Sequence, residues 1–209
     1  MNLFSNSLCF SEDERIDYLN LYFKKSMELI TSLSLGIGLS ACCGFRIFVP
    51  LLVTNIAALS GHYHFGQDFA WMGTMTAFYI FASATVLEII GYYIPWFDNL
   101  LDFIATPASI IAGTILTTSF LGGDISPMMK WVLGFLIGGG SAGVVQLGTT
   151  ATRLASTATT AGFGNPIIAT IENILSVIFS LMSIFLPILL GVGAVLLVMY
   201  LGKKLVRRL

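Results

Sequence analysis

The sequence predicts an all-α fold, a polytopic transmembrane helical bundle, on three observations. The first is composition, since 56% of the 209 residues are hydrophobic and 10% are charged, against about 25% charged residues in soluble domains. The second is spacing: Leu29 to Gly202 contains nine charged residues, leaving stretches that match the roughly 20 apolar residues of a membrane-spanning helix. The third is a pair of overlong apolar regions interrupted by glycine and proline, which predicts broken or re-entrant helices.

The first 28 residues are predicted to form a separate amphipathic segment in the cytoplasm, lying on the membrane surface. Acidic residues at Glu12, Asp13, Glu14 and Asp17 replace the basic start and early apolar core of a secretory signal. We therefore expect this segment to remain in the mature chain. Residues 29–202 are predicted to form the transmembrane domain, and residues 203–209 a basic cytoplasmic tail.

Six apolar stretches are predicted to supply the helices. Residues 29–60 are too long for one upright helix, and Gly36, Gly38, Gly44 and Pro50 predict a helix, a break, and a second helix or half-helix. Residues 127–164 are also overlong, with breaks expected at GGGSAG and in TTATRLASTATTAGFG, and Ser126 with Pro127 predicts the helix start. The remaining stretches are residues 69–94, 99–121, 166–186 and 187–201.

The two halves of the transmembrane region share an order of residues. Each half, about 29–121 and about 127–202, holds one arginine, then a glutamate, then a proline six residues before a glycine. This order predicts two degenerate repeats that enclose a site at their interface. The matching residues are Arg46, Glu88, Pro107 and Gly113 in the first half, and Arg153, Glu172, Pro187 and Gly193 in the second.

Basic residues predict the orientation. Equal numbers of crossings in two repeats give an even total, so both termini lie on one side. Lys24 and Lys25 precede the first apolar stretch and KKLVRR closes the chain, so both termini are expected in the cytoplasm. With three crossings in each half the repeats would be inverted, and with an even number in each half they would be parallel.

The two intramembrane arginines carry the functional prediction. An arginine at the bilayer centre costs at least about 2.5–3.5 kcal/mol, so Arg46 and Arg153 need partners. Glu88 and Glu172 are the opposite charges at similar depth, and the four residues could pair within or across the repeats. One interpretation is a polar midplane cavity, lined also by hydroxyls of the threonine-rich stretch 149–160. The other is a structural role, in which Arg46–Glu88 and Arg153–Glu172 are buried ion pairs that fix helix register.

Asp98 and Asp102 lie four residues apart, on one helical face. They could bind a cation or relay protons, or they could be a solvated helix start with Asp98 as the cap. His62 and His64 are interpreted as an ordinary surface loop, because two histidines without a third ligand are a weak metal signal. No metal or other cofactor is expected, and the three cysteines show neither metal nor redox spacing.

The chain resembles a bacterial membrane family known as domain of unknown function 4126. The resemblance rests on a Gly-x-Arg-x-Phe-x-Pro motif, a Glu-x6-Pro-x2-Asp segment, a Pro-x5-Gly helix and a second-half arginine followed by Asn-Pro and a glutamate. It implies a polytopic membrane domain in the bacterial inner membrane but no substrate, and the chain departs from the family pattern at Gly91, Tyr92 and Asn173. The residues concerned are Gly44, Arg46, Phe48, Pro50, Glu88, Pro95, Asp98, Pro107, Gly113, Arg153, Asn165, Pro166 and Glu172.

Transport is the function that the residues favour: a small transporter, channel or lipid flippase with Arg46, Glu88, Arg153 and Glu172 around its site. The arginines favour a small anionic or lipid substrate. A non-catalytic scaffold or accessory subunit is the alternative. An intramembrane lipid enzyme is disfavoured, because Asp98 and Asp102 are its only candidate catalytic groups. The expected partners are the lipid bilayer and a second copy of the chain, not nucleic acid.

Overall fold

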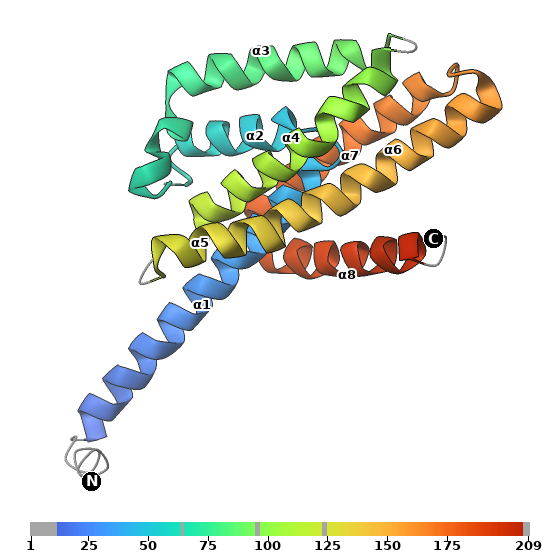
Figure 1. The fold of residues 1–209 in the computed structure, drawn as a ribbon. Coiled ribbons are helices and arrows are strands. Elements are labelled where there is room, and N and C mark those ends of the chain that lie inside the picture. Colours follow the sequence, from blue (N-terminus) through green and yellow to red (C-terminus); the bar gives the residue numbers. More distant parts are fainter. Residues whose placement is uncertain (1–11, 64, 95–96, 123–124, 207–209) are drawn as a thin grey trace.

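The structure, a computed structural model, describes residues 12–63, 65–94, 97–122 and 125–206, and every regular element in these ranges is helical (Figure 1). The predicted all-α class is confirmed. Four helices are long and apolar enough to cross a membrane, or five when η1 and α3, bent by 62°, count as one span. The elements are α1 (Glu12–Cys43), α2 (Phe48–Leu59), η1 (Gln67–Gly73), α3 (Met75–Gly91), α4 (Phe97–Phe120), α5 (Pro127–Leu133), η2 (Gly134–Gly139), α6 (Gly140–Thr160), α7 (Asn165–Phe185) and α8 (Pro187–Val206).

The break expected in the first overlong region is confirmed. Helix α1 ends at Cys43 and α2 begins at Phe48, and the residues between them lie tightly against α6. A Cβ atom on Gly44 would lie 2.6 Å from the carbonyl oxygen of Ala142, so only glycine permits this approach.

Helix α1 differs from the prediction at its other end. It runs without interruption from Glu12 to Cys43, so residues 12–28 continue a longer helix instead of forming a separate one. Figure 1 shows the N-terminal part of α1 projecting from the bundle, while its C-terminal part packs inside it. The side chains of Leu35 and Leu39 are buried there.

Of the two breaks expected in the second overlong region, the one at GGGSAG is wrong, whereas the one in TTATRLASTATTAGFG is confirmed by the turn between α6 and α7. Residues 127–160 form one continuous helical stretch, in which GGGSAG lies across the junction of the π-helical segment η2 and α6. Glycine costs little in a membrane helix whose backbone groups stay bonded. The Ser126 side chain accepts from the Met129 N–H, so the predicted cap is confirmed. The stretch ends at Ala161 and Gly162, both with positive φ.

Glycines bring α4 and η2 into backbone contact. A Cβ on Gly138 would lie 2.3 Å from the carbonyl oxygen of Gly113, and one on Gly113 would lie 2.7 Å from that of Gly138. On its other side α4 meets α1, where the Ser40 hydroxyl donates to the Gly113 carbonyl at 2.7 Å and lies 2.8 Å from the Thr117 hydroxyl. Small residues and interhelical hydrogen bonds are the usual means of helix association in lipid.

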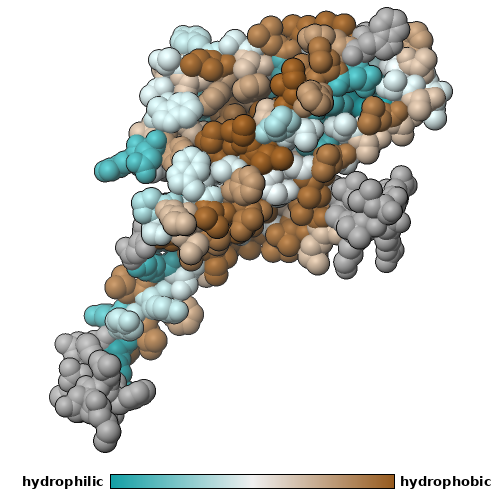
Figure 2. Space-filling model, in the orientation of Figure 1, coloured by the Kyte–Doolittle hydropathy of each residue, from teal (hydrophilic) through white to brown (hydrophobic). Residues whose placement is uncertain are grey.

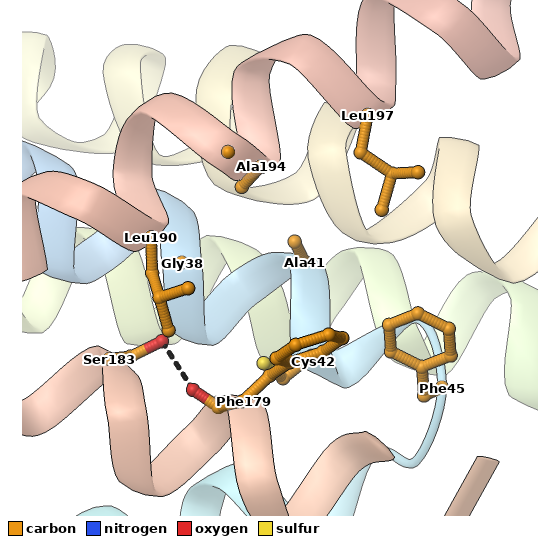
Figure 3. Close-up of a pocket in the computed structure, with 10 residues that line it drawn as sticks. Gly38, Ala41, Cys42, Phe45, Phe179, Ser183, Leu190, Ala194 and Leu197 are labelled. Carbon is orange, nitrogen blue, oxygen red and sulfur yellow. Dashed lines mark hydrogen bonds between the residues drawn. The ribbon is translucent and has the colours of Figure 1, made fainter. Parts of the chain in front are cut away.

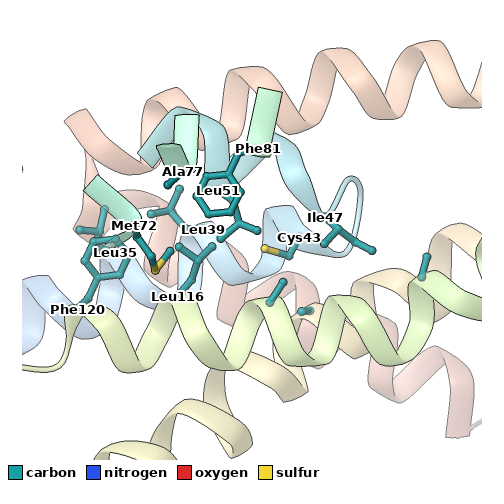
Figure 4. Packing of buried hydrophobic residues seen from close by; sticks show 13 residues of the cluster. Leu35, Leu39, Cys43, Ile47, Leu51, Met72, Ala77, Phe81, Leu116 and Phe120 are labelled. Atoms are coloured by element: carbon teal, nitrogen blue, oxygen red, sulfur yellow. The ribbon is translucent and has the colours of Figure 1, made fainter. Parts of the chain in front are cut away.

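An apolar cluster fills the space between α1, α2, α3 and α4 (Figure 4). Leu39 of α1 and Leu116 of α4 are fully buried at its centre, and Phe81 of α3 covers it. The outer surface is also apolar over much of the face in Figure 2. Exposed residues such as Leu87, Phe103 and Ile167 would form an extensive apolar surface in water, which is typical of a bilayer-facing protein.

Candidate functional site

The two arginines singled out from the sequence lie together in the folded chain. Arg46 lies in the break between α1 and α2, and Arg153 lies in α6, seven residues before its end. Both side chains are 0% exposed, so their positive charges need partners inside the bundle.

Glu172 of α7 is the shared partner of the two arginines. Its Oε2 atom lies 3.2 Å from Nη1 of Arg46 and also accepts from Nη1 of Arg153. Its Oε1 atom is buried without a hydrogen-bond partner among the described residues. The predicted pair of Arg153 with Glu172 is therefore confirmed, whereas Arg46 pairs with Glu172 instead of Glu88.

Asp102 of α4 holds the other side of Arg153. Nε of Arg153 donates to Oδ2 of Asp102 at 2.9 Å, and Nη2 donates to Oδ1 at 2.6 Å. Two parallel bonds between a guanidinium and a carboxylate give both strength and orientation. Asp102, Arg153, Glu172 and Arg46 thus form a continuous chain of alternating charge, which we call the charge network.

Tyr92, just after α3, covers the charge network. The centre of its ring lies 4.0 Å from Cζ of Arg46 and 4.3 Å from Cζ of Arg153, a cation–π geometry for both. Its hydroxyl donates to Oδ1 of Asp102 at 3.1 Å. Arg46 also donates to Oδ1 of Asn173 and to the carbonyl of Ala169.

Glu88 has a different role from the one predicted. Its carboxylate accepts from the backbone N–H of Ile47 at 2.8 Å and from that of Phe48 at 3.0 Å. It therefore caps the N-terminus of α2, where a negative charge is favourable. The predicted ion pair with Arg46 is wrong, because Arg46 pairs with Glu172.

Asp98 and Asp102 are buried, at 1% and 3% exposure, so the solvated helix start is wrong. Their side chains also bind different partners. Asp98 accepts from the Asn99 N–H at 2.9 Å and from the side-chain amide of Asn165, which also donates to Thr157 at 2.9 Å. Asn165 thereby joins the starts of α4 and α7.

The charge network lies near one end of the bundle. Glu172 is seven residues after the first residue of α7, Arg153 seven before the last of α6, and Asp102 five after the first of α4. At about 1.5 Å per residue these positions are roughly 8–10 Å from the helix ends, between the end and the middle of each helix. The connections from α3 to α4 and from α6 to α7 both lie there (Figure 1).

Two cavities flank α6 and reach the charge network from its sides. One, of about 330 Å³, lies between α6, α7 and α8 and has Glu172 in its lining. The other, of about 530 Å³, lies between α4 and α6 and has Asp102 in its lining. A third cavity of about 190 Å³, between α1, α7 and α8, is lined by residues such as Cys42, Phe179 and Leu190 and contains no charged group (Figure 3).

The other residues considered from the sequence lie apart from the charge network. His62 is exposed, and His64 and Cys9 lie outside the described residues. Cys42 and Cys43 are buried free thiols. Within the part of the chain that the structure describes, no group of three or more His, Cys, Asp or Glu side chains could hold a metal ion. Of the hydroxyls in stretch 149–160, Thr149 lies 3.5 Å from Nη2 of Arg153.

Sequence reasoning missed Tyr92, Asn173 and Gln146. Gln146 of α6 is 1% exposed and donates to Oδ1 of Asp102 at 3.5 Å. Tyr92 and Asn173 both contact Arg46. The available signal for them was that both are positions at which the chain departs from the family pattern. Because Tyr92 and Asn173 are uncharged, nothing else in the sequence indicated that they contact an arginine.

The apolar helices and the buried charge network define a multi-pass helical membrane protein. Residues 33–207 match the model of a family described as "Domain of unknown function (DUF4126)", and the chain belongs to this family. A comparison with curated proteins found no match, and a comparison with solved structures found none either.

Proposed function

We propose that this protein is a proton-coupled transporter of the membrane, with the charge network as its coupling site. The observation that carries this proposal is the sharing of one oxygen of Glu172 by two buried arginines, while the other oxygen has no partner in the part of the chain that the structure describes. A carboxylate in this position holds Arg46 and Arg153 together only while it is ionised.

Protonation of Glu172 would remove the attraction that joins the two arginines. Arg153 would keep its two bonds to Asp102, whereas Arg46 would keep neutral acceptors, Asn173 and the carbonyl of Ala169. The break after α1 would then be free to move relative to α6. Intramembrane carboxylates and arginines are frequent parts of proton relays and substrate pathways.

The titratable groups around Glu172 have other partners, which supports protonation at Glu172 in particular. Asp102 is tied to Arg153 by two bonds, and Glu88 is tied to the start of α2. The Tyr92 hydroxyl is bound to Asp102. Among the described carboxylates, Glu172 is the one that pairs with both arginines, so its protonation has the largest effect on the network.

Proton flux into proteoliposomes tests the proposal. Vesicles containing a pH-sensitive dye would be exposed to pools of organic anions, amines, polyols and membrane amphiphiles, with wild-type protein, Glu172→Gln and Glu88→Gln. We expect at least one pool to drive proton flux with wild-type protein, no flux with Glu172→Gln, and retained flux with Glu88→Gln.

A scaffold function is the second candidate, and the burial of the charge network favours it. Both arginines are fully buried and paired, as in a structural lock. If no pool drives flux, or if Glu172→Gln transports as well as the wild type, the transport proposal fails. A stoichiometric membrane partner that co-purifies with the protein would then support the scaffold.

Inverted repeats, a re-entrant first region and location in a bacterial inner membrane are part of the same proposal. The break between Cys43 and Phe48 supports a re-entrant segment. The continuous helix over residues 127–160 has no such break, so the two halves are not alike at their arginines. The duplicated order of residues and the basic residues at both ends support two repeats and cytoplasmic termini.

A further inference from the structure

We infer that the cavity between α6, α7 and α8 binds the head group of a membrane amphiphile that carries a hydrogen-bond donor, a hydroxyl or an amine. This amphiphile is the substrate class of the proposed transporter, and its transport rests on the proposed function. Its binding in the cavity does not. The cavity, here called the lateral groove, is lined by residues that include Phe45, Thr149, Thr152, Ile168, Ile171 and Glu172.

The walls of the lateral groove fit an alkyl chain. Phe45, Ile168 and Ile171 supply apolar side chains, and Ile171 is 53% exposed. In a bilayer such an exposed residue of an apolar helix faces lipid. The volume of about 330 Å³ is that of roughly ten water-sized groups, enough for a small head group and the first methylenes of a chain.

The polar atoms of the lateral groove are acceptors. Glu172 lines the groove, and its Oε1 atom is buried without a hydrogen-bond partner among the described residues. The hydroxyl of Thr152 donates to the Gly148 carbonyl at 2.9 Å, and that of Thr149 donates to the Gln146 carbonyl at 2.9 Å. Both hydroxyl protons are therefore used, and the oxygen lone pairs remain.

An anionic head group does not match this set of atoms. The arginines that would attract it are turned to Glu172 and Asp102 and are 0% exposed. An acceptor facing another acceptor leaves both unpaired, whereas a hydroxyl or amine would satisfy the orphan oxygen of Glu172. The arginines in the sequence had favoured an anionic substrate, whereas the lateral groove favours a head group that donates a hydrogen bond.

Photolabelling in lipid nanodiscs tests the inference. Four probes with the same diazirine-bearing alkyl chain would carry an alcohol, a primary amine, a carboxylate or a trimethylammonium group, the last a cation without a donor. Labelled peptides would be mapped by mass spectrometry. We expect the alcohol or the amine to label the groove segments of α6 and α7 at least about threefold more than the other two probes do.

Two variants test the site itself. Thr152→Val keeps the shape of an exposed side chain but removes an acceptor, so labelling by the donor probes should fall by about threefold to tenfold. Thr106→Val, on α4 in the other cavity, should leave labelling of the lateral groove unchanged. Thermal unfolding of both variants would show that they fold.

The outcomes separate the inference from the proposed function. Equal labelling by all four head groups, or preferential labelling by the carboxylate, would overturn the inference. So would labelling that is unaffected by Thr152→Val in the folded protein. Donor-selective labelling without proton flux would support the binding site and contradict the transport proposal. Proton flux without labelling in the lateral groove would support transport and overturn the inferred binding site.

Discussion

Arg46 and Arg153 form ion pairs with the same oxygen atom of Glu172. Arg46 lies in the break between α1 and α2, and Arg153 lies in α6, seven residues before its end. A single carboxylate therefore bridges an arginine of the first half of the chain and an arginine of the second. This relationship also makes the network sensitive to one proton or one substitution.

Glu172→Gln is expected to destabilise the protein by about 3–5 kcal/mol, the usual effect of removing one partner from a buried ion pair. Arg46 would be the group left without a counter-charge. Equilibrium unfolding in detergent measures the change. Glu28→Gln, at an exposed position of α1, is the matched control and should lie within about 0.5 kcal/mol of wild type. Equal stability of the two variants would show that the network does not hold the fold together.

Tyr92→Phe and Tyr92→Leu separate the two contacts of this side chain. The phenylalanine variant loses only the bond to Asp102, so we expect a loss of about 0.5–1.5 kcal/mol. The leucine variant also loses the aromatic face against both guanidinium groups, which should cost about 1–2 kcal/mol more. The same unfolding measurement applies, and similar values for both variants would mean that the ring contacts contribute nothing.

Gly138→Ala and Gly140→Ala form a matched pair, two residues apart. An added methyl group at Gly138 would meet the carbonyl oxygen of Gly113 at 2.3 Å, whereas nothing lies within 4 Å at Gly140. The first change should destabilise by about 1–3 kcal/mol through overpacking, and the second should stabilise by about 0.5–1 kcal/mol. Melting temperatures that shift in the same direction would contradict the close packing of α4 on η2.

Fusions at the two termini test the proposed orientation. If both ends are cytoplasmic, alkaline phosphatase fused to either end in bacteria should be inactive, and green fluorescent protein at either end should fluoresce. The physical reason is retention of basic residues on the cytoplasmic side. A phosphatase that is active at one end only would mean an odd number of crossings and would exclude two repeats with equal numbers of crossings.

Much of the secondary structure could be predicted from hydrophobic pattern and local signals. The start of α5 follows from Ser126 and Pro127, and the first break follows from its glycines. The error at residues 127–160 has a physical cause. The glycines that break a helix in water instead allow close packing inside a membrane, where an unbonded backbone would cost more than the loss of chain entropy.

The sequence by itself determined that the chain is an all-helical membrane protein and that its intramembrane arginines, Arg46 and Arg153, need partners. Apolar length and the cost of an unpaired charge are properties of local sequence. Only the tertiary structure decided the pairing, because several carboxylates lie within reach along the chain. Glu88 accepts hydrogen bonds from the backbone N–H groups at the start of α2. Asp102, for which the sequence left open a cation or proton site and a solvated helix start, is the partner of Arg153. The close approach of α1, α4, α6 and α7, which sets these distances, depends on contacts between residues far apart in the chain.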